Sequence, residues 1–248
     1  MSLDKFTFLL GGCDLEMLEI SKVLKSLNIR YYDEGLSWTE AFLSRYAKIL
    51  NNDDFFVGVE LKSDITEPAH YKLIDHHNKL SSNLSSLEQV AALLGVKLTW
   101  EQQLIAANDR GYIPAMNALG ASKEEIENIR LRDRQAQGAT ANDEKLAEKS
   151  IEKNLSVIEG ITVIRSLTAR FSTITDRLYP CGRLLIFNEE SLTYYGEGIS
   201  ALDREFEKQV KQDIAYYGGS FFGFTVEAIK QAGGIEKLLD TVISKVSG

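Results

Sequence analysis

Two adjacent histidines stand out, because the chain of 248 residues contains only three. His76 and His77 follow Asp75 directly after the apolar run YKLI, at the end of an expected strand. Imidazole and carboxylate groups together can bind a divalent metal or transfer protons near neutral pH. The segment is therefore a candidate metal or acid–base site, and an exposed turn without a function is the alternative. His70 has no acidic partner at ligand spacing and is expected at the surface.

Carboxylates follow other apolar runs in the same way. Asp14 and Glu16 come after KFTFLLGG, Glu60 lies near the end of DFFVGVEL, and Asp109 follows LIAAN. In an open parallel sheet, the loops at the carboxyl ends of the strands converge on one edge, where ligands bind. Carboxylates crowded there would repel one another, and their pKa values would rise unless a cation neutralised them. The expected metal ligands are Asp14, Glu16, Glu60, Asp75, His76 and Asp109.

The donor set favours a hard divalent cation. Oxygen ligands with one or two imidazoles suit Mn²⁺ or Mg²⁺, and Zn²⁺ is the next choice. We expect the site to bind one or two ions. Two ions about 3.5–4 Å apart are the usual arrangement for in-line displacement at phosphorus. Two of the acids also have structural alternatives: Asp14 could cap the first helix, and Asp109 could cap a turn at Gly111 or pair with Arg110.

The elements that must position these residues alternate along the chain. Strands are expected over residues 5–12, 29–32, 54–61 and 71–74. Helices are expected over residues 14–29, 37–52, 85–96 and 100–108. Strands that alternate with helices predict an α/β domain in which helices cover a parallel sheet.

The composition changes twice in the second half of the chain. Residues 122–150 are rich in charged and small residues, which predicts exposed helices that connect two domains. Strand patterns then return at ITVIRSL, RLLIFNE and SLTYYGE, followed by helical patterns, the last of them interrupted near Gly233 and Gly234. We therefore expect an N-terminal domain over residues 1–135, a linker over 136–154 and a smaller α+β domain over 155–248.

The segment IDHHN and the order of the acids resemble the DHH phosphoesterases. This family includes manganese-dependent pyrophosphatases, single-strand exonucleases, oligoribonucleases and cyclic-dinucleotide phosphodiesterases. Its four motifs would be Asp14-Leu15-Glu16, Glu60, Asp75-His76-His77 and Asp109. The resemblance implies a metal-dependent hydrolase with a parallel-sheet domain and a smaller α+β domain, in which a metal-bound hydroxide attacks phosphorus in line. It makes His77 and Asp75 the catalytic candidates: His77 faces the substrate, and Asp75 orients it or bridges to a metal.

The second half extends the resemblance. YYGGSFFGF is similar to a glycine-rich segment that closes over the substrate in the family, which implies that Gly218 and Gly219 bind phosphate. RFSTITDRL also resembles a segment of the family's second domain, so Arg170 and Arg177 are the expected substrate-binding arginines. The implied substrate is a small phosphorylated molecule, a nucleotide or a short oligonucleotide, bound in a cleft between the domains.

The chain also departs from the family's pattern. Glu16 and Glu60 stand where the family usually has aspartate, and two histidines that often accompany the motifs are missing. These departures favour an alternative, a non-catalytic nucleotide- or RNA-binding protein that keeps the DHH fold.

Composition narrows the class of protein further. Thirty-six acids against 28 bases give a net charge of −8, which argues against binding of long duplex DNA. The sequence has no uncharged apolar run of about 18 residues, so no membrane span is expected, and an N-terminus without signal-peptide character makes the cytoplasm the expected location. Cys13 and Cys181 are too few for a disulfide framework and are expected to be buried or half-buried thiols.

Overall fold

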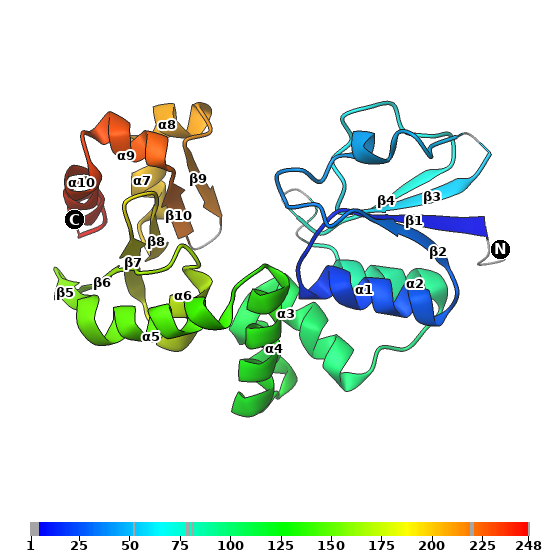
Figure 1. Cartoon of the computed structure of the whole chain (residues 1–248), viewed down its shortest axis with the longest axis horizontal. Coiled ribbons are helices and arrows are strands. Elements are labelled where there is room, and N and C mark those ends of the chain that lie inside the picture. Colours follow the sequence, from blue (N-terminus) through cyan, green and yellow to red (C-terminus); the bar gives the residue numbers. More distant parts are fainter. Residues whose placement is uncertain (1–4, 52, 78–79, 81, 219–220, 248) are drawn as a thin grey trace. The chain divides into compact units, whose positions relative to one another are not determined.

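Figure 1 shows the computed structural model of the chain, which describes residues 5–51, 53–77, 80, 82–218 and 221–247. The chain forms two compact units, Met1–Gly138 and Ala139–Gly248, and each is described by itself. In the described residues, no helix combines the length and the apolar character that crossing a bilayer requires.

The first unit contains a sheet of four parallel strands in the order β2-β1-β3-β4. The strands are β1 (Phe6–Leu10), β2 (Arg30–Asp33), β3 (Phe55–Val59) and β4 (Tyr71–Ile74). Leu10 pairs with Val59, and Val59 pairs with Ile74, so three strands end side by side at their carboxyl ends. The residues that follow these strands therefore meet at one edge of the sheet, as the sequence predicted.

Helices cover one face of this sheet (Figure 1). Helices α1 (Leu15–Ser26) and α2 (Ser86–Leu94) lie along the sheet, and α3 (Trp100–Leu119) and α4 (Lys123–Ala136) pack against these helices. Alternate strand residues such as Phe8, Leu10, Val57 and Val59 pack against them in one apolar core. Ser85, Thr99 and Ser122 each begin a helix with a reciprocal capping box, which satisfies backbone amides that a helix leaves free.

The opposite face, which carries Leu9 and Phe56, packs against the segment between β2 and β3. The expected helix over 37–52 was wrong, because this segment forms only a short 3-10 helix, η2 (Leu43–Tyr46), and turns. Phe42 instead pairs with Lys62 as an isolated parallel bridge, and the amide of Lys62 donates to the carbonyl of Ala41. This pairing holds the backbone around Phe42 in an extended conformation, so the helix that the apolar residues predicted does not form there.

Helix α4 was expected to be an exposed connector, and the structure corrects this. Ile126 and Ile129 belong to the main core, and Arg130, Asp133 and Arg134 are buried as well. The charges are tolerated inside because they are paired: Arg130 Nη1 lies 2.7 Å from Asp133 Oδ2, one helical turn away. The charged composition concealed a helix that packs in the core.

The second unit contains a mixed sheet of six strands in the order β5-β6-β7-β8-β10-β9, in which only β6 and β7 are parallel. Its strands are β5 (Leu155–Ile158), β6 (Ile161–Arg165), β7 (Arg183–Phe187), β8 (Leu192–Gly196), β9 (Ala215–Gly218) and β10 (Phe221–Phe224). Its helices are α5 (Ala141–Asn154), α6 (Ser172–Leu178), α7 (Ile199–Glu205), α8 (Glu207–Lys211), α9 (Val226–Ala232) and α10 (Ile235–Ser247). Helices α5 and α6 pack on one face, and α7, α9 and α10 pack on the other.

The predicted fold class, a parallel-sheet α/β domain followed by a smaller α+β domain, is confirmed. The expected linker, residues 136–154, is helical over Ala141–Asn154, and this helix packs against β6 and α6 in the second unit. The expectation for the cysteines held for Cys181, which is half-buried, and was wrong for Cys13, which is exposed.

Candidate functional site

The carboxyl end of β3 brings Glu60 to the edge of the sheet. Its backbone amide donates to the carbonyl of Ile74 at 2.8 Å, and its φ of 56° lies in the left-handed region. Gly11 passes close by: a Cβ at that position would lie 2.6 Å from the carbonyl oxygen of Val59 and 2.7 Å from that of Glu60. Glycine is therefore required at Gly11 for the chain after β1 to pass the end of β3.

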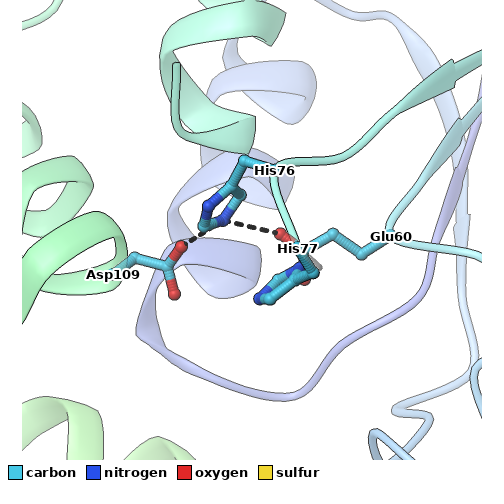
Figure 2. A group of neighbouring side chains, drawn as sticks. All are labelled: Glu60, His76, His77 and Asp109. Atoms are coloured by element: carbon cyan, nitrogen blue, oxygen red, sulfur yellow. Dashed lines mark ion pairs between the residues drawn. The ribbon is translucent and has the colours of Figure 1, made fainter. Parts of the chain in front are cut away.

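Four side chains gather at this edge, and Figure 2 shows them. Glu60, His76, His77 and Asp109 each offer a potential ligand atom, and these atoms lie within 4.8 Å of one another. His76 is central, since its Nε2 lies 2.5 Å from Asp109 Oδ2 and 3.6 Å from Glu60 Oε1. The residues come from the ends of β3 and β4, where Glu60 and the two histidines follow the strands, and from α3, which carries Asp109. We call this group, together with Glu16, the acidic cluster.

Glu16 joins the cluster from the first turn of α1. One carboxylate oxygen, Oε1, accepts a hydrogen bond from the amide of Leu87 at 3.0 Å, which ties α1 to the start of α2. The other oxygen, Oε2, lies 3.8 Å from Nε2 of His76. The side chain of Glu16 is therefore both anchored and directed at the histidine.

Several buried atoms of the cluster have no hydrogen-bond partner. They are Oε2 of Glu16, Nε2 of His76 and Oδ2 of Asp109. Nε2 of His76 and Oδ2 of Asp109 form a close ion pair at 2.5 Å, although their geometry does not meet the criteria for a hydrogen bond. Buried polar atoms without partners are costly, and a group of nitrogen and oxygen donors that converge in this way fits a divalent cation. The residues present thus fit the expected metal.

The electrostatics of the cluster are those of crowded carboxylates. Burial and the charges of Asp109 and Glu60 raise the pKa of Glu16 well above its usual value. Burial by itself would lower the pKa of His76, but the carboxylates of Asp109, Glu60 and Glu16 outweigh it and raise the pKa to about 10. Without a cation, a proton on His76 balances part of the negative charge.

Asp14 caps α1, and its pKa is affected by the charges of the acidic cluster. Its Oδ1 accepts from the amide of Met17 at 2.8 Å, so the structural alternative for this residue is correct. Burial and the charges of Asp109 and Glu60 also raise its pKa to about 7. Asp14 is not one of the four residues whose potential ligand atoms converge, so its role as a ligand stays a prediction.

Asp75 and His77 form a pair beside the cluster. His77 Nδ1 and its backbone nitrogen both lie 2.9 Å from Asp75 Oδ1. Burial would raise the pKa of Asp75, but these contacts with His77 lower it overall. Burial would likewise lower the pKa of His77, and Asp75 raises it. This geometry would allow Asp75 to orient the ring of His77, and that role stays a prediction. His77 also belongs to the four converging residues.

The remaining predicted residues belong to the second unit, so their distance from the cluster is not defined. Arg170 is exposed, and Arg177 pairs with Glu144 at 2.6 Å and Glu148 at 3.1 Å of α5. Gly218 ends β9, and Gly219 lies outside the described residues. Their substrate-binding roles stay predictions.

Sequence reasoning missed three residues around the site. Asp133 accepts from the amide of Leu15 at 3.3 Å, and Arg130 donates to Oδ1 of Asn108 at 2.8 Å, next to Asp109. Opposite charges one turn apart beside Ile126 and Ile129 could have indicated this network. The third is Trp38, whose ring lies against His77, and no local pattern pointed to it.

Comparison with known proteins identifies a solved structure with a similar fold. No protein-family model matches the sequence. No curated protein matches it. Among solved structures, the pGpG-specific phosphodiesterase PggH from Vibrio cholerae superposes with a TM-score of 0.52 at 14% sequence identity, over 100% of both chains.

Two further structures are more distant. RecJ from Thermus thermophilus in complex with Mn²⁺ has a TM-score of 0.45 at 11% identity, over 98% of this chain and 52% of that one. The DHH domain of a member of the S1p family of ribosomal proteins has a TM-score of 0.47 at 11% identity, over 97% of this chain and 87% of that one. Both TM-scores are below 0.5, so the fold assignment depends on the Vibrio structure.

The fold and the acidic cluster define a two-unit α/β protein with a candidate metal centre at the carboxyl edge of its parallel sheet. This is the fold of the DHH phosphoesterases, and the resemblance seen in the sequence is confirmed at the level of the fold.

Proposed function

We propose that the protein is a metal-dependent phosphoesterase that hydrolyses a small phosphorylated substrate, a nucleotide or a short oligonucleotide. The observation that carries the proposal is the acidic cluster, in which buried donor atoms of Glu16, His76 and Asp109 converge without hydrogen-bond partners. The Vibrio protein with the same fold is named as a pGpG-specific phosphodiesterase, which supports a nucleotide substrate.

The residues that would hold one or two Mn²⁺ or Mg²⁺ ions are Asp14, Glu16, Glu60, His76 and Asp109. Asp75, the sixth ligand expected from the sequence, would instead orient His77. When bound, the metal would supply Lewis-acid chemistry and an activated water near neutral pH. Glu16, whose pKa is raised by burial and by the charges of Asp109 and Glu60, must lose its proton to act as a ligand. Glu16 is held in place by the amide of Leu87, so its free oxygen is already oriented.

His77 would act on the substrate itself. Its imidazole is half-buried at the cluster, and Asp75 fixes the ring through Nδ1 at 2.9 Å. A protonated His77 can donate a hydrogen bond to a phosphoryl oxygen or a proton to the leaving oxygen. In the second unit, Arg170, Arg177, Gly218 and Gly219 would bind the remaining phosphate groups. The domain limits of 1–135 and 155–248 belong to the same proposal.

The substitution His76→Ala tests the proposal. Purified protein is screened with pyrophosphate, linear dinucleotides and cyclic dinucleotides, in Mn²⁺ and in Mg²⁺. We expect metal-dependent hydrolysis that falls by about 100-fold or more in His76→Ala, since even residues behind the ligands change activity by 10–100-fold. His70→Ala is the matched control, because His70 is exposed and stacks on Phe55. Undiminished hydrolysis in His76→Ala would refute the catalytic assignment.

We propose a second function for the case in which the protein acts without a metal and His76 is protonated. Its raised pKa allows an imidazolium to neutralise the carboxylates without a metal. The protein would then be a non-catalytic nucleotide- or RNA-binding protein with the DHH fold. Metal analysis separates the two proposals: one or two ions per chain support the enzyme, and tight nucleotide binding without metal supports the binding protein.

A further inference from the structure

An exposed tryptophan borders the acidic cluster. Trp38 is 46% exposed, although tryptophan is usually well buried. The centroid of its indole lies 4.4 Å from that of the His77 imidazole, at an interplanar angle of 62°. Trp38 keeps a large aromatic surface open beside the residue proposed to act on the substrate.

A lysine lies over the same ring. Lys62 Nζ is 4.8 Å from the centroid of Trp38 and donates a hydrogen bond to the Trp38 carbonyl at 3.2 Å. Lys62 follows Glu60 by two residues, so its ammonium belongs to the same edge of the sheet as the cluster. Within the ranges that the structure describes, the Lys62 ammonium contacts the Trp38 carbonyl and the rings of Trp38 and Phe42, and none of these groups is a carboxylate. A positive charge without a protein counter-ion is available there for an anionic group.

The backbone holds these two side chains in place. The amide of Lys62 donates to the carbonyl of Ala41 at 2.9 Å, and its carbonyl accepts from the amide of Leu43 at 2.9 Å. These bonds tie the segment that carries Trp38 to the segment that carries Glu60. The aromatic ring, the ammonium and the acidic cluster therefore have a fixed spacing, which lowers the entropic cost of binding a ligand.

We propose that Trp38 and Lys62 form a subsite for a nucleoside next to the phosphoryl group that the acidic cluster would receive. A nucleobase stacks on the open indole surface, and the Lys62 ammonium pairs with a neighbouring phosphate. The subsite requires an unpaired base, so it selects a dinucleotide or the end of a short single strand over an inorganic phosphate or a duplex. This inference rests on the proposed function for the position of the reacting phosphate.

Binding tests the subsite independently of catalysis. In the variant Trp100→Phe, Trp38 is the only tryptophan, so its fluorescence reports on the subsite directly. A 5′-phosphorylated dinucleotide with a phosphorothioate linkage is titrated in Mg²⁺. We expect saturable quenching and a roughly ten-fold rise in Kd in Lys62→Gln. Lys72→Gln on β4 is the matched control and should leave the Kd unchanged. Absence of quenching at millimolar dinucleotide would overturn the proposal.

Kinetics then separate stacking from support of His77. Trp38→Ala should raise KM for the dinucleotide about ten-fold with kcat within about two-fold, and Trp38→Phe should recover most of the loss. A dinucleotide with an abasic sugar should be cleaved equally by the wild type and Trp38→Ala, and Trp100→Ala should behave as wild type on both substrates. Equal losses on both dinucleotides would show that Trp38 only positions His77 and would refute the subsite. Quenching of Trp38 without any hydrolysis would leave the subsite standing and remove the proposed function.

Discussion

Glu16 and Glu60 stand where the resemblance leads one to expect aspartate, and the structure shows how the longer side chain of Glu16 is used. Its carboxylate reaches the amide of Leu87 at 3.0 Å while its second oxygen points to His76. An aspartate at this position is one methylene shorter and could not make both contacts from the same backbone. The exchange therefore adds a link from α1 to α2 and leaves the cluster intact.

The pair of Asp75 and His77 gives a prediction at the residue scale. Asp75→Asn keeps the size of the side chain but removes the charge that orients His77 and raises its pKa. We expect kcat to fall by about 100-fold while the affinity for Mn²⁺ stays within about two-fold, because Asp75 acts through His77. Steady-state kinetics and isothermal titration with Mn²⁺ measure the two effects.

The same variant distinguishes the two roles predicted for Asp75. If Asp75 were a metal ligand, the variant would lose Mn²⁺ affinity together with kcat. His77→Asn is the companion variant, and it should lose about as much kcat as Asp75→Asn if the two residues act as a unit. A double variant no worse than either single one would support that reading.

Among the elements, α4 has an unexpected part in the site. Arg130 donates to Asn108 and to Asp133, and its guanidinium lies 4.5 Å from the centroid of Tyr112. Asp133 accepts from the amide of Leu15 at the start of α1. One buried ion pair thus joins α4 to the helix that carries Glu16 and to the helix that carries Asp109.

Removal of one partner of this pair should be costly. Asp133→Ala leaves the Arg130 guanidinium buried with one acceptor fewer, and we expect the free energy of unfolding to fall by about 3 kcal/mol or more. Arg132→Ala is the matched control, because Arg132 pairs with the exposed Glu101 and should contribute less than about 1 kcal/mol. Urea unfolding followed by tryptophan fluorescence suits the measurement, since both tryptophans lie in the first unit. Similar losses in the two variants would contradict the role given to the buried pair.

These elements also show how far the sequence could be read. The strands that lead to Glu60 and Asp75 are short apolar runs, and α2 begins at a capping box at Ser85, so local signals were sufficient. Helix α4 was misjudged because the ion pair of Arg130 and Asp133 is buried only through long-range packing. The segment around Phe42 was misjudged for the same kind of reason, since its pairing partner Lys62 is distant in the chain.

At the scale of the whole molecule, the gathered acids make the stability of the first unit depend on pH. Asp14 has a folded-state pKa of about 7 against an ordinary value of 3.8, so the folded state binds its proton more tightly than the unfolded state does. The stability from that proton is complete below about pH 4 and is lost as the pH rises to 7. The pKa of His76 is raised from 6.5 to about 10, so its contribution to stability is lost as the pH rises from about 6.5 to about 10. Both shifts have the same sign.

The metal-free protein should therefore become less stable from pH 5 to pH 9. We expect the Tm in EDTA, followed by tryptophan fluorescence, to fall steadily across this range. In Mn²⁺ the Tm should exceed that in EDTA by a margin that grows with pH, because the ligands must be deprotonated to bind the ion. Asp14→Asn should flatten the EDTA profile between pH 5 and pH 7, whereas His70→Ala should not change it. A Tm in EDTA that rises with pH, or one that Mn²⁺ leaves unchanged at pH 9, would show that these carboxylates neither crowd one another nor hold a cation.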